Sequence, residues 1–294
     1  FKYEILVHDD ASTDGTTEII REYEEKYPSI IKPIYQTENQ YSKGIQINHI
    51  YNYSRAVGKY VALCEGDDYW IDPFKLQKQV DYMETHPDCT FCFTNGKIID
   101  MLQGSEERIF IPFSKENKDY FNNSKAYDVG SLGLLGFIPT ASFMFRKSIL
   151  ENLPEFYYKR YPAGDMKLKL YATSKGYAYF INYVTCVYRA NVKGSAMSSW
   201  KKYNKEQSLK HNQGYIDLIN EVDEYTNFQY AEELDKLKLG FEVRMLFLKK
   251  QKSLIKEKKF REWLKKQNIF VQLKIITSLY LPNLYNFLKR TIKK

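Results

Sequence analysis

The sequence predicts an α/β fold with a Rossmann-like, mostly parallel sheet flanked by helices, followed by a C-terminal helical appendage. In the first 200 residues, short apolar runs alternate with segments whose apolar residues recur at helical spacing, and the turns between them are short. This alternation is typical of parallel strands joined by helical crossovers. After residue 200 the pattern is helical throughout. We therefore expect an α/β domain over residues 1–200 and a basic helical region over 201–294.

Each predicted element rests on a local pattern. Apolar runs predict strands over residues 2–8, 30–35, 60–64 and 89–95. Helices are expected before Pro28, over residues 45–57 and from Pro73 to His86. Beyond Gly96 we expect loops and short antiparallel strands over 100–130, strands over 136–146 and 177–188, and helices over 147–153 and 166–174. Because the chain begins at Phe1 within a strand pattern and without Met, part of the natural N-terminus is expected to be missing.

The charge is unevenly distributed. Residues 249–294 contain 14 Lys and Arg but only Glu257 and Glu262, a net charge of +12, whereas the rest of the chain carries 30 basic and 34 acidic residues, a net charge of −4. No nucleic-acid-binding motif accompanies the basic tail, so no nucleic-acid partner is expected. The sequence has no apolar run long enough to span a membrane and no visible signal peptide.

The four cysteines indicate the compartment. Cys89 and Cys92 have the spacing of a metal or redox pair, but they alternate with Phe91 and Phe93 in a strand pattern and no second pair exists. We interpret them as reduced core residues, which predicts a cytoplasmic location.

Three carboxylates directly follow the strand at 60–64. Glu65, Asp67 and Asp68 stand within four residues, where mutual repulsion and loss of hydration are costly unless a positive charge lies among them. Oxygen ligands suit Mg²⁺ or Mn²⁺, which in turn hold phosphates. The alternative is an acidic turn that leads into the next helix, with Asp72 as its N-cap.

A second acidic pair, Asp9 and Asp10, stands where the first strand gives way to a helix. Carboxylates at this place can accept hydrogen bonds from a nucleotide's base or ribose. The alternative is a turn that caps the helix through Ser12, Thr13 or Asp14.

Two acidic segments together resemble the family 2 glycosyltransferases of the GT-A fold, of the bacterial polysaccharide type. They are Asp-Asp-Ala-Ser-Thr-Asp-Gly-Thr at residues 9–16 and Glu-Gly-Asp-Asp-Tyr-Trp at residues 65–70. The resemblance covers about residues 1–200. It implies inverting transfer of a sugar from a nucleotide-diphosphate donor, expected to be a UDP-sugar, with Mn²⁺ or Mg²⁺ on the diphosphate. The implied acceptor is a glycan or lipid-linked glycan in cell-surface polysaccharide assembly.

The resemblance also assigns roles to the acidic residues. Asp10, with Asp9 beside it, matches the base-recognising aspartate. Asp67 and Asp68 match the DXD pair: Asp68 is expected to bind the metal, and Asp67 to contact the metal and the donor's ribose or sugar. Glu65 replaces the usual first Asp and is expected near the donor.

Further residues match outside the two acidic segments. Gly164-Asp165 resembles the family's base motif, which makes Asp165 the candidate general base; its alternative role is the N-cap of the 166–174 helix. Lys43 falls near a donor-contacting basic position, and its alternative is a solvated loop lysine. The segment 187–195 resembles a phosphate-covering loop in which Arg189 and Lys193 would bind phosphate. Asn191 stands there in place of a His.

The C-terminal region suggests a membrane partner. Ile269, Leu273, Ile276 and Tyr280 form an apolar face, extended by Leu284, Phe287 and Leu288, and basic residues flank it. Such a helix is expected to lie on the anionic inner face of the cell membrane. The alternative is packing on the catalytic domain or a homo-oligomer interface. A non-catalytic sugar-nucleotide-binding module remains the alternative to an enzyme.

Overall fold

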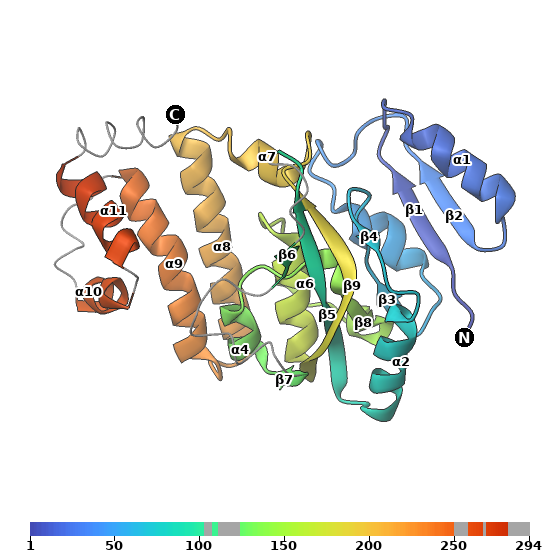
Figure 1. The fold of residues 1–294 in the computed structure, drawn as a ribbon. Coiled ribbons are helices and arrows are strands. Elements are labelled where there is room, and N and C mark those ends of the chain that lie inside the picture. The colour runs from blue at the N-terminus through green and yellow to red at the C-terminus, as the bar shows by residue number, and fades with distance from the viewer. Residues whose placement is uncertain (103–107, 111–123, 250–257, 267–268, 282–294) are drawn as a thin grey trace. The chain divides into compact units, whose positions relative to one another are not determined.

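The computed structural model describes residues 1–102, 108–110, 124–249, 258–266 and 269–281 (Figure 1). It divides the chain into two compact units, residues 1–192 and 193–294. This division lies eight residues before the boundary expected at residue 200. The expected extensions at Leu284, Phe287 and Leu288 lie outside the described residues.

Unit 1 begins with a β-α-β element. Strand β1 (Ile5–Asp9), helix α1 (Thr16–Lys26) and strand β2 (Ile31–Tyr35) follow the predicted pattern. β1 and β2 pair in parallel at five positions, from Ile5 with Ile31 to Asp9 with Tyr35. They form a two-stranded sheet of their own.

The larger sheet has the strand order β3-β8-β5-β9-β4, with β6 beside β5 and β7 beside β9. Its longest pairing, β5 with β9, is parallel over eleven positions, and the antiparallel pairings each join only two or three. These strands are β3 (Tyr60–Ala62), β4 (Tyr69–Trp70), β5 (Cys89–Asp100), β6 (Arg108–Ile109), β7 (Lys125–Tyr127), β8 (Met144–Arg146) and β9 (Tyr177–Ala190).

Helices flank this sheet and complete the core (Figure 1). One buried cluster joins Met83 of α2 to Cys89 and Cys92 of β5, so these two cysteines lie in the core as expected. The α/β fold class with flanking helices is confirmed. Besides α1, the α-helices described in unit 1 are α2 (Lys75–Thr85), α4 (Val129–Leu134), α5 (Glu155–Tyr158) and α6 (Gly164–Ser174).

Several predicted elements are shorter than their patterns suggested. The helix expected over 45–57 is a π-helical turn, Asn48–Asn52, followed by a 3₁₀ turn, Tyr53–Arg55. The Ser54 hydroxyl and the Arg55 Nε donate to backbone carbonyls four residues back, which competes with regular helix geometry. Helix α2 begins at Lys75 with Phe74 at its N-cap position, so Asp72, the N-cap in the alternative interpretation, is not the N-cap residue. Its carboxylate accepts the Phe74 backbone N–H at 2.8 Å just before the helix.

The segment 136–153 also differs from its prediction. Only its residues 144–146 form a strand, because Gly136 adopts a φ of 74° and a 3₁₀ turn, Thr140–Ser142, follows Pro139. The helix expected over 147–153 is a 3₁₀ turn, Lys147–Leu150. The turn at 140–142 contacts Glu65 through Thr140.

The described residues of unit 2 are mainly helical, as predicted. It contains α7 (Ala196–Trp200), α8 (Lys205–Tyr225), α9 (Ala231–Lys249), α10 (Lys258–Lys265) and α11 (Ile269–Tyr280). Val243, Phe260, Leu264 and Ile275 form a buried cluster that ties α9, α10 and α11 together. Within the described part of the chain, no helix combines the length and apolar character that a membrane span requires.

Candidate active site

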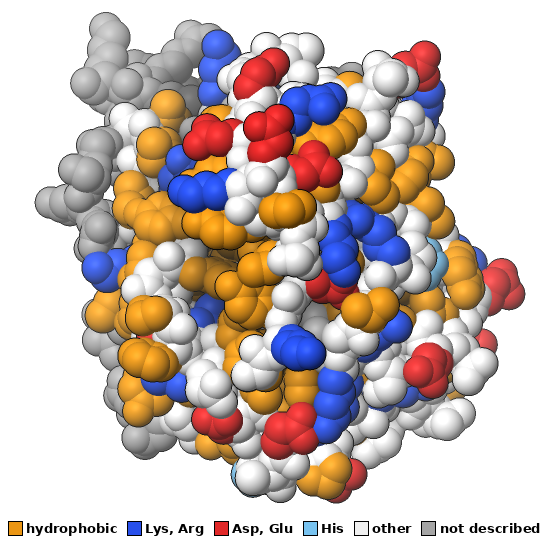
Figure 2. All heavy atoms as spheres, turned by 90° about the vertical axis from the view of Figure 1, so that its right-hand side faces the viewer, with side chains coloured by type: hydrophobic (Ala, Val, Ile, Leu, Met, Phe, Trp, Pro, Cys, Tyr) orange, Lys and Arg blue, Asp and Glu red, His pale blue; other side chains and the backbone are white. Residues whose placement is uncertain are grey.

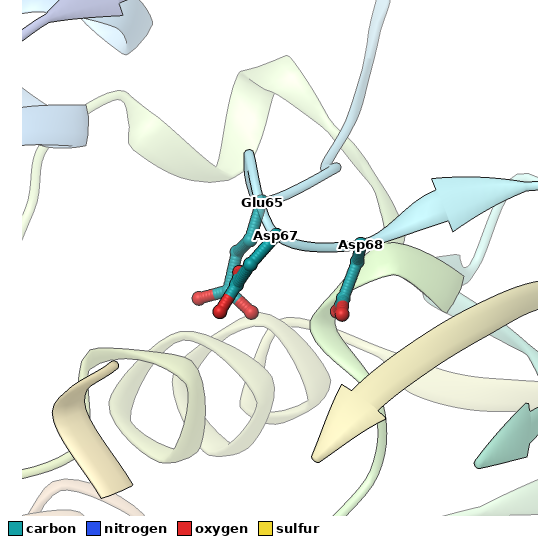
Figure 3. Close-up of side chains that lie close together, drawn as sticks. All are labelled: Glu65, Asp67 and Asp68. Atoms are coloured by element: carbon teal, nitrogen blue, oxygen red, sulfur yellow. The ribbon is translucent and has the colours of Figure 1, made fainter. Parts of the chain in front are cut away.

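Glu65, Asp67 and Asp68 lie on one tight turn between β3 and β4. The turn closes through a hydrogen bond of 3.0 Å from the Asp68 N–H to the Glu65 carbonyl. One carboxylate oxygen from each residue lies within 4.8 Å of the others. Figure 3 shows the three carboxylates on the same side of this turn. The structure therefore brings together three residues that the sequence predicted as a metal and donor site.

Arg189, more than a hundred residues later, holds this turn in place. Its backbone N–H donates to Asp68 Oδ1 at 2.9 Å, and its guanidinium donates to the backbone carbonyls of Asp67 and Gly66. The pairing of β4 with β9 brings Arg189 there, because Tyr69 pairs with Val187. Arg189 thus lies at the site, as expected, but its observed partners are the turn and its carboxylate.

The acidic turn has the electrostatics of a cation site. Asp68 is 7% exposed, and its Oδ2 is a buried atom without a hydrogen-bond partner. Burial first, and then the charge of Asp67, raise the pKa of Asp68 to about 6, although the Arg189 N–H opposes the shift. An unpartnered buried carboxylate oxygen beside two further carboxylates is costly without a cation. The oxygen donors present fit Mg²⁺ or Mn²⁺.

The pKa of Glu65 is raised by its surroundings, which include the charge of Asp165. Although the residue as a whole is exposed, loss of hydration around its carboxyl group raises its pKa to about 7, followed by the negative charges of Asp165, Asp68 and Asp67. The Thr140 hydroxyl acts in the opposite direction. The charge of Asp165 acts on the Glu65 carboxyl group, so the two carboxyl groups lie within electrostatic range of each other.

Asp165 occupies the first turn of α6. The N-cap of this helix is Ala163, with no side-chain capping hydrogen bond, so the alternative role of Asp165 as N-cap was wrong. Asp165 is half-buried. Lys169, one turn further along α6 and 3% exposed, contributes a positive charge on the same side. The carboxyl group of Asp165 is therefore available for chemistry.

The pair at the end of β1 has clear structural partners. Asp9 is 3% exposed and accepts hydrogen bonds from the Ser12 N–H and the Thr17 hydroxyl, so it organises the start of α1. Asp10 accepts from the backbone N–H groups of Gln40 at 2.7 Å and Tyr41 at 2.9 Å. Asp10 thereby anchors the loop that follows β2.

The remaining predicted residues are Lys43, Lys193 and Asn191. Lys43 pairs with Glu38 on the loop after β2, and both side chains are more than half exposed. Lys193 belongs to unit 2 and is exposed. Asn191 adopts a φ of 63° and donates through its side chain to Asp100 at 2.9 Å. The donor contacts predicted for Lys43 and Lys193 stay predictions.

Sequence reasoning missed three neighbours of the acidic turn. Thr140 contacts Glu65, and the adjacent Ala141 carbonyl accepts the Trp70 indole N–H at 2.8 Å. Tyr188 lies among the carboxylates: burial first, and then the charges of Asp68, Glu65, Asp67 and Asp165, raise its pKa to about 12. Tyr188 belongs to the segment 187–195, which resembles a phosphate-covering loop. Thr140 and Ala141 belong to no motif that the sequence pointed to.

An acidic turn at the end of a strand, facing a carboxylate on a neighbouring helix, is the arrangement expected of a GT-A glycosyltransferase domain. The family model described as "Glycosyl transferase family 2" matches residues 1–153, just over half of the sequence. The chain belongs to this family.

Several curated relatives match part of the chain. An uncharacterized protein of Mycobacterium tuberculosis H37Rv is 40% identical over 147 residues, which cover 50% of this chain and 39% of the relative. The putative teichuronic acid biosynthesis glycosyltransferase TuaG of Bacillus subtilis is 38% identical over 97 residues, 33% of this chain and 36% of the relative.

A third relative has a more specific name. It is the UDP-Glc:alpha-D-GlcNAc-diphosphoundecaprenol beta-1,3-glucosyltransferase WfaP of Escherichia coli, 35% identical over 82 residues, which cover 28% of this chain and 30% of the relative. The matched segments thus span less than half the length of each of these relatives.

Proposed function

We propose that this chain is a metal-dependent, inverting glycosyltransferase that moves a sugar from a UDP-sugar to a hydroxyl group of an acceptor glycan. The observation that carries this proposal is the unpartnered, buried Oδ2 of Asp68 within a group of three carboxylates. Such a group favours a divalent cation, and a divalent cation favours a diphosphate. Membership of the family supports transfer of a sugar, and the printed name of WfaP supports a UDP-linked donor.

The residues of this chain divide the chemical work. Asp68 and Asp67 would hold the metal, which when bound supplies positive charge for the departing diphosphate. Arg189 fixes Asp68 through its backbone N–H and keeps the turn rigid through its guanidinium. Asp165 accepts the proton of the attacking acceptor hydroxyl, which permits attack opposite the leaving group. Asp10 orders the loop at the proposed nucleotide end of the site.

The experiment that tests this proposal is a thermal-shift panel of UDP, GDP, CDP and TDP, each with and without Mn²⁺. We expect UDP with Mn²⁺ to raise the melting temperature, because a ligand bound only by the folded state stabilises it. A matched series with UDP-sugars would then be analysed for released UDP. No metal-dependent shift with any nucleotide contradicts the proposal, and binding without turnover would indicate the non-catalytic module instead.

The acceptor is proposed to be a lipid-linked glycan at an anionic membrane surface. The diphosphoundecaprenol in the printed name of WfaP supports a lipid carrier. In unit 2, Ile269, Leu273, Ile276 and Tyr280 of α11 are all at least 40% exposed, while Ile275 packs inside. Exposed Lys265 and Lys266 precede this apolar face. An apolar face with flanking cations suits the interface of an anionic bilayer.

A further inference from the structure

A group of exposed aromatic side chains lies beside the acidic turn. Unit 1 leaves many large hydrophobic side chains open to solvent, and Figure 2 shows such side chains among charged ones on one face of the molecule. One set gathers around β4, the start of α2 and the middle of β9. Its members and their exposed fractions are Trp70 (36%), Ile71 (40%), Phe74 (64%) and Tyr183 (56%).

Trp70 is held as a rigid surface. Its indole N–H donates to the Ala141 carbonyl, and the Lys75 Nζ lies 4.5 Å from the centre of its ring. Lys75 is 1% exposed, and its ammonium group donates to Gln79 Oε1, so the position of the cation is itself fixed by burial and by this hydrogen bond. A hydrogen bond at the ring edge and a cation at the ring face leave little freedom for rotation.

The ring of Trp70 borders a hollow of about 320 Å³. This volume is at the lower end of the range for small-molecule sites, about 300–1,000 Å³. The hollow has both apolar and charged walls, since its lining residues are Trp70, Ile71, Asp72, Pro73, Lys75 and Leu76.

A pair of aromatic rings continues the surface beyond the hollow. The Lys78 Nζ bonds to Asp72 Oδ2 at 2.5 Å, and it lies 5.7 Å from the Phe74 ring centre and 4.7 Å from the Tyr183 ring centre. Lys78 and Asp72 therefore connect the wall of the hollow to both rings.

A β-bulge turns Tyr183 outward. Along β9, Ile181 pairs with Thr94 and the next pair is Val184 with Asn95, so two residues of β9 are inserted at this point. Bulges commonly redirect a side chain beside an active site. Because of this bulge, Tyr183 faces solvent next to Lys78 although its neighbours Ile181 and Thr185 are buried.

The aromatic surface starts at the acidic turn. Asp68 and Trp70 are two residues apart, and the 3₁₀ turn that holds Trp70 through Ala141 also contacts Glu65 through Thr140. In the other direction, Arg189 and Tyr183 are six positions apart along β9, which corresponds to about 20 Å of extended strand. A ligand on this surface would therefore reach from the acidic turn to Tyr183.

We propose that this surface, formed by Trp70, Phe74 and Tyr183 with the Asp72–Lys78 pair, binds sugar rings of the acceptor glycan. The C–H faces of a pyranose carry a small positive charge and match the negative faces of aromatic rings. Asp72 and Lys78 supply an acceptor and a donor for hydroxyl groups. This inference rests on the proposed function, because it names where the glycan of that reaction lies.

The test is saturation-transfer NMR on the full chain. The probes are methyl glycosides of glucose, galactose, rhamnose and N-acetylglucosamine at millimolar concentration, with UDP and Mg²⁺ in the same sample. We expect signals from ring protons of at least one glycoside. With the double variant Phe74→Ala/Tyr183→Ala, these signals should fall about tenfold while UDP signals persist.

The control is Tyr23→Ala, which removes a ring of similar exposure (49%) from α1. It should leave the glycoside signals unchanged, and thermal melts of all variants should report intact folding. Glycoside signals that are absent in the wild type, or equal in the double variant, overturn the aromatic glycan site while UDP signals remain. Loss of UDP signals in the wild type would instead overturn the proposed function.

Discussion

The backbone N–H of Arg189 donates to Oδ1 of Asp68 over 2.9 Å, while Oδ2 of the same carboxylate has no partner. This contact fixes the orientation of Asp68 from the far end of β9. It also leaves Oδ2 of Asp68 without a hydrogen-bond partner in a group of three carboxylates. A metal-binding carboxylate that already accepts a hydrogen bond from the backbone is oriented before a cation binds.

The guanidinium of Arg189 should matter for metal affinity. In Arg189→Ala the bonds to the Asp67 and Gly66 carbonyls are lost, while the backbone contact to Asp68 persists. We expect about tenfold weaker Mn²⁺ binding and a free energy of unfolding lower by about 1–3 kcal/mol. Isothermal titration calorimetry measures the Mn²⁺ affinity, and urea unfolding measures the free energy of unfolding. Equal losses in the control Arg244→Ala, an exposed arginine of unit 2, would argue against a specific role.

Replacement of Asp68 separates ligation from folding. In Asp68→Asn we expect Mn²⁺-dependent UDP affinity to fall by at least about tenfold. Removal of a residue that only supports a metal ligand already costs about 10–100-fold in metal affinity, and loss of a ligand should cost no less. The melting temperature without metal should not fall, because the carboxylate that is lost is buried with an unpartnered oxygen. UDP titrations at fixed Mn²⁺ decide the matter, and unchanged affinity would remove Asp68 from the metal site.

The base assignment predicts a different pattern. Asp165→Asn should bind UDP and Mn²⁺ almost normally but transfer sugar about 10²-fold more slowly or worse, the usual scale of a general base. The side chain caps no helix, so the fold should be unaffected. Single-turnover rates with saturating donor are the measurement. Transfer at near wild-type rate would require another residue as base.

Asp9 should support the fold in a pH-dependent way. Burial alone raises the pKa of Asp9, but hydrogen bonds from Ser12 and Thr17 outweigh it, so the pKa lies below its ordinary value of 3.8. The folded state then binds fewer protons than the unfolded state, and the stabilisation is present above pH 3.8 and lost as the pH falls through the lowered pKa.

The variant Asp9→Asn measures this contribution. We expect its free energy of unfolding at neutral pH to be about 1–3 kcal/mol below that of the wild type. The difference should shrink when urea unfolding is repeated at progressively lower pH below about 4. A difference that does not change with pH would mean that the charge of Asp9 is not what stabilises the start of α1.

The exposed face of α11 should bind anionic vesicles. We expect the full chain to co-sediment with vesicles rich in phosphatidylglycerol at low salt and to dissociate as salt is added. Leu273→Glu/Ile276→Glu should weaken binding, because two charges replace apolar groups at the bilayer surface. Ile19→Glu, which alters an exposed isoleucine of α1, is the matched control. No sedimentation of the wild type would contradict the membrane proposal.

The sequence predicted those features that depend on neighbouring residues. The strand before Glu65 and the helix that carries Asp165 follow from local apolar patterns, and the three carboxylates of the turn are adjacent in sequence. Contacts between distant segments were not predictable in this way. The parallel pairing of β5 with β9 and the hydrogen bond from Trp70 to Ala141 join residues 71 or more positions apart.

The failures have the same physical origin. The segment 45–57 has helical periodicity, but its side chains compete for backbone carbonyls and produce π and 3₁₀ turns. Asp165 has the sequence context of an N-cap, yet the helix begins one residue earlier. Periodicity reports which face of a segment is apolar, but it specifies neither the hydrogen-bonding geometry of a helix nor the residue at which the helix begins.

With Asp10 at the proposed nucleotide end of the site, its contacts have a further consequence for the kinetics of donor binding. Its two carboxylate oxygens already hold the Gln40 and Tyr41 N–H groups, and Arg160 donates to the Tyr41 carbonyl from another segment. The loop is thus ordered before a nucleotide arrives, and little conformational entropy is lost on binding. The association rate should therefore be set by diffusion and orientation rather than by loop closure, and differences in affinity among nucleotides should arise mainly in their dissociation rates.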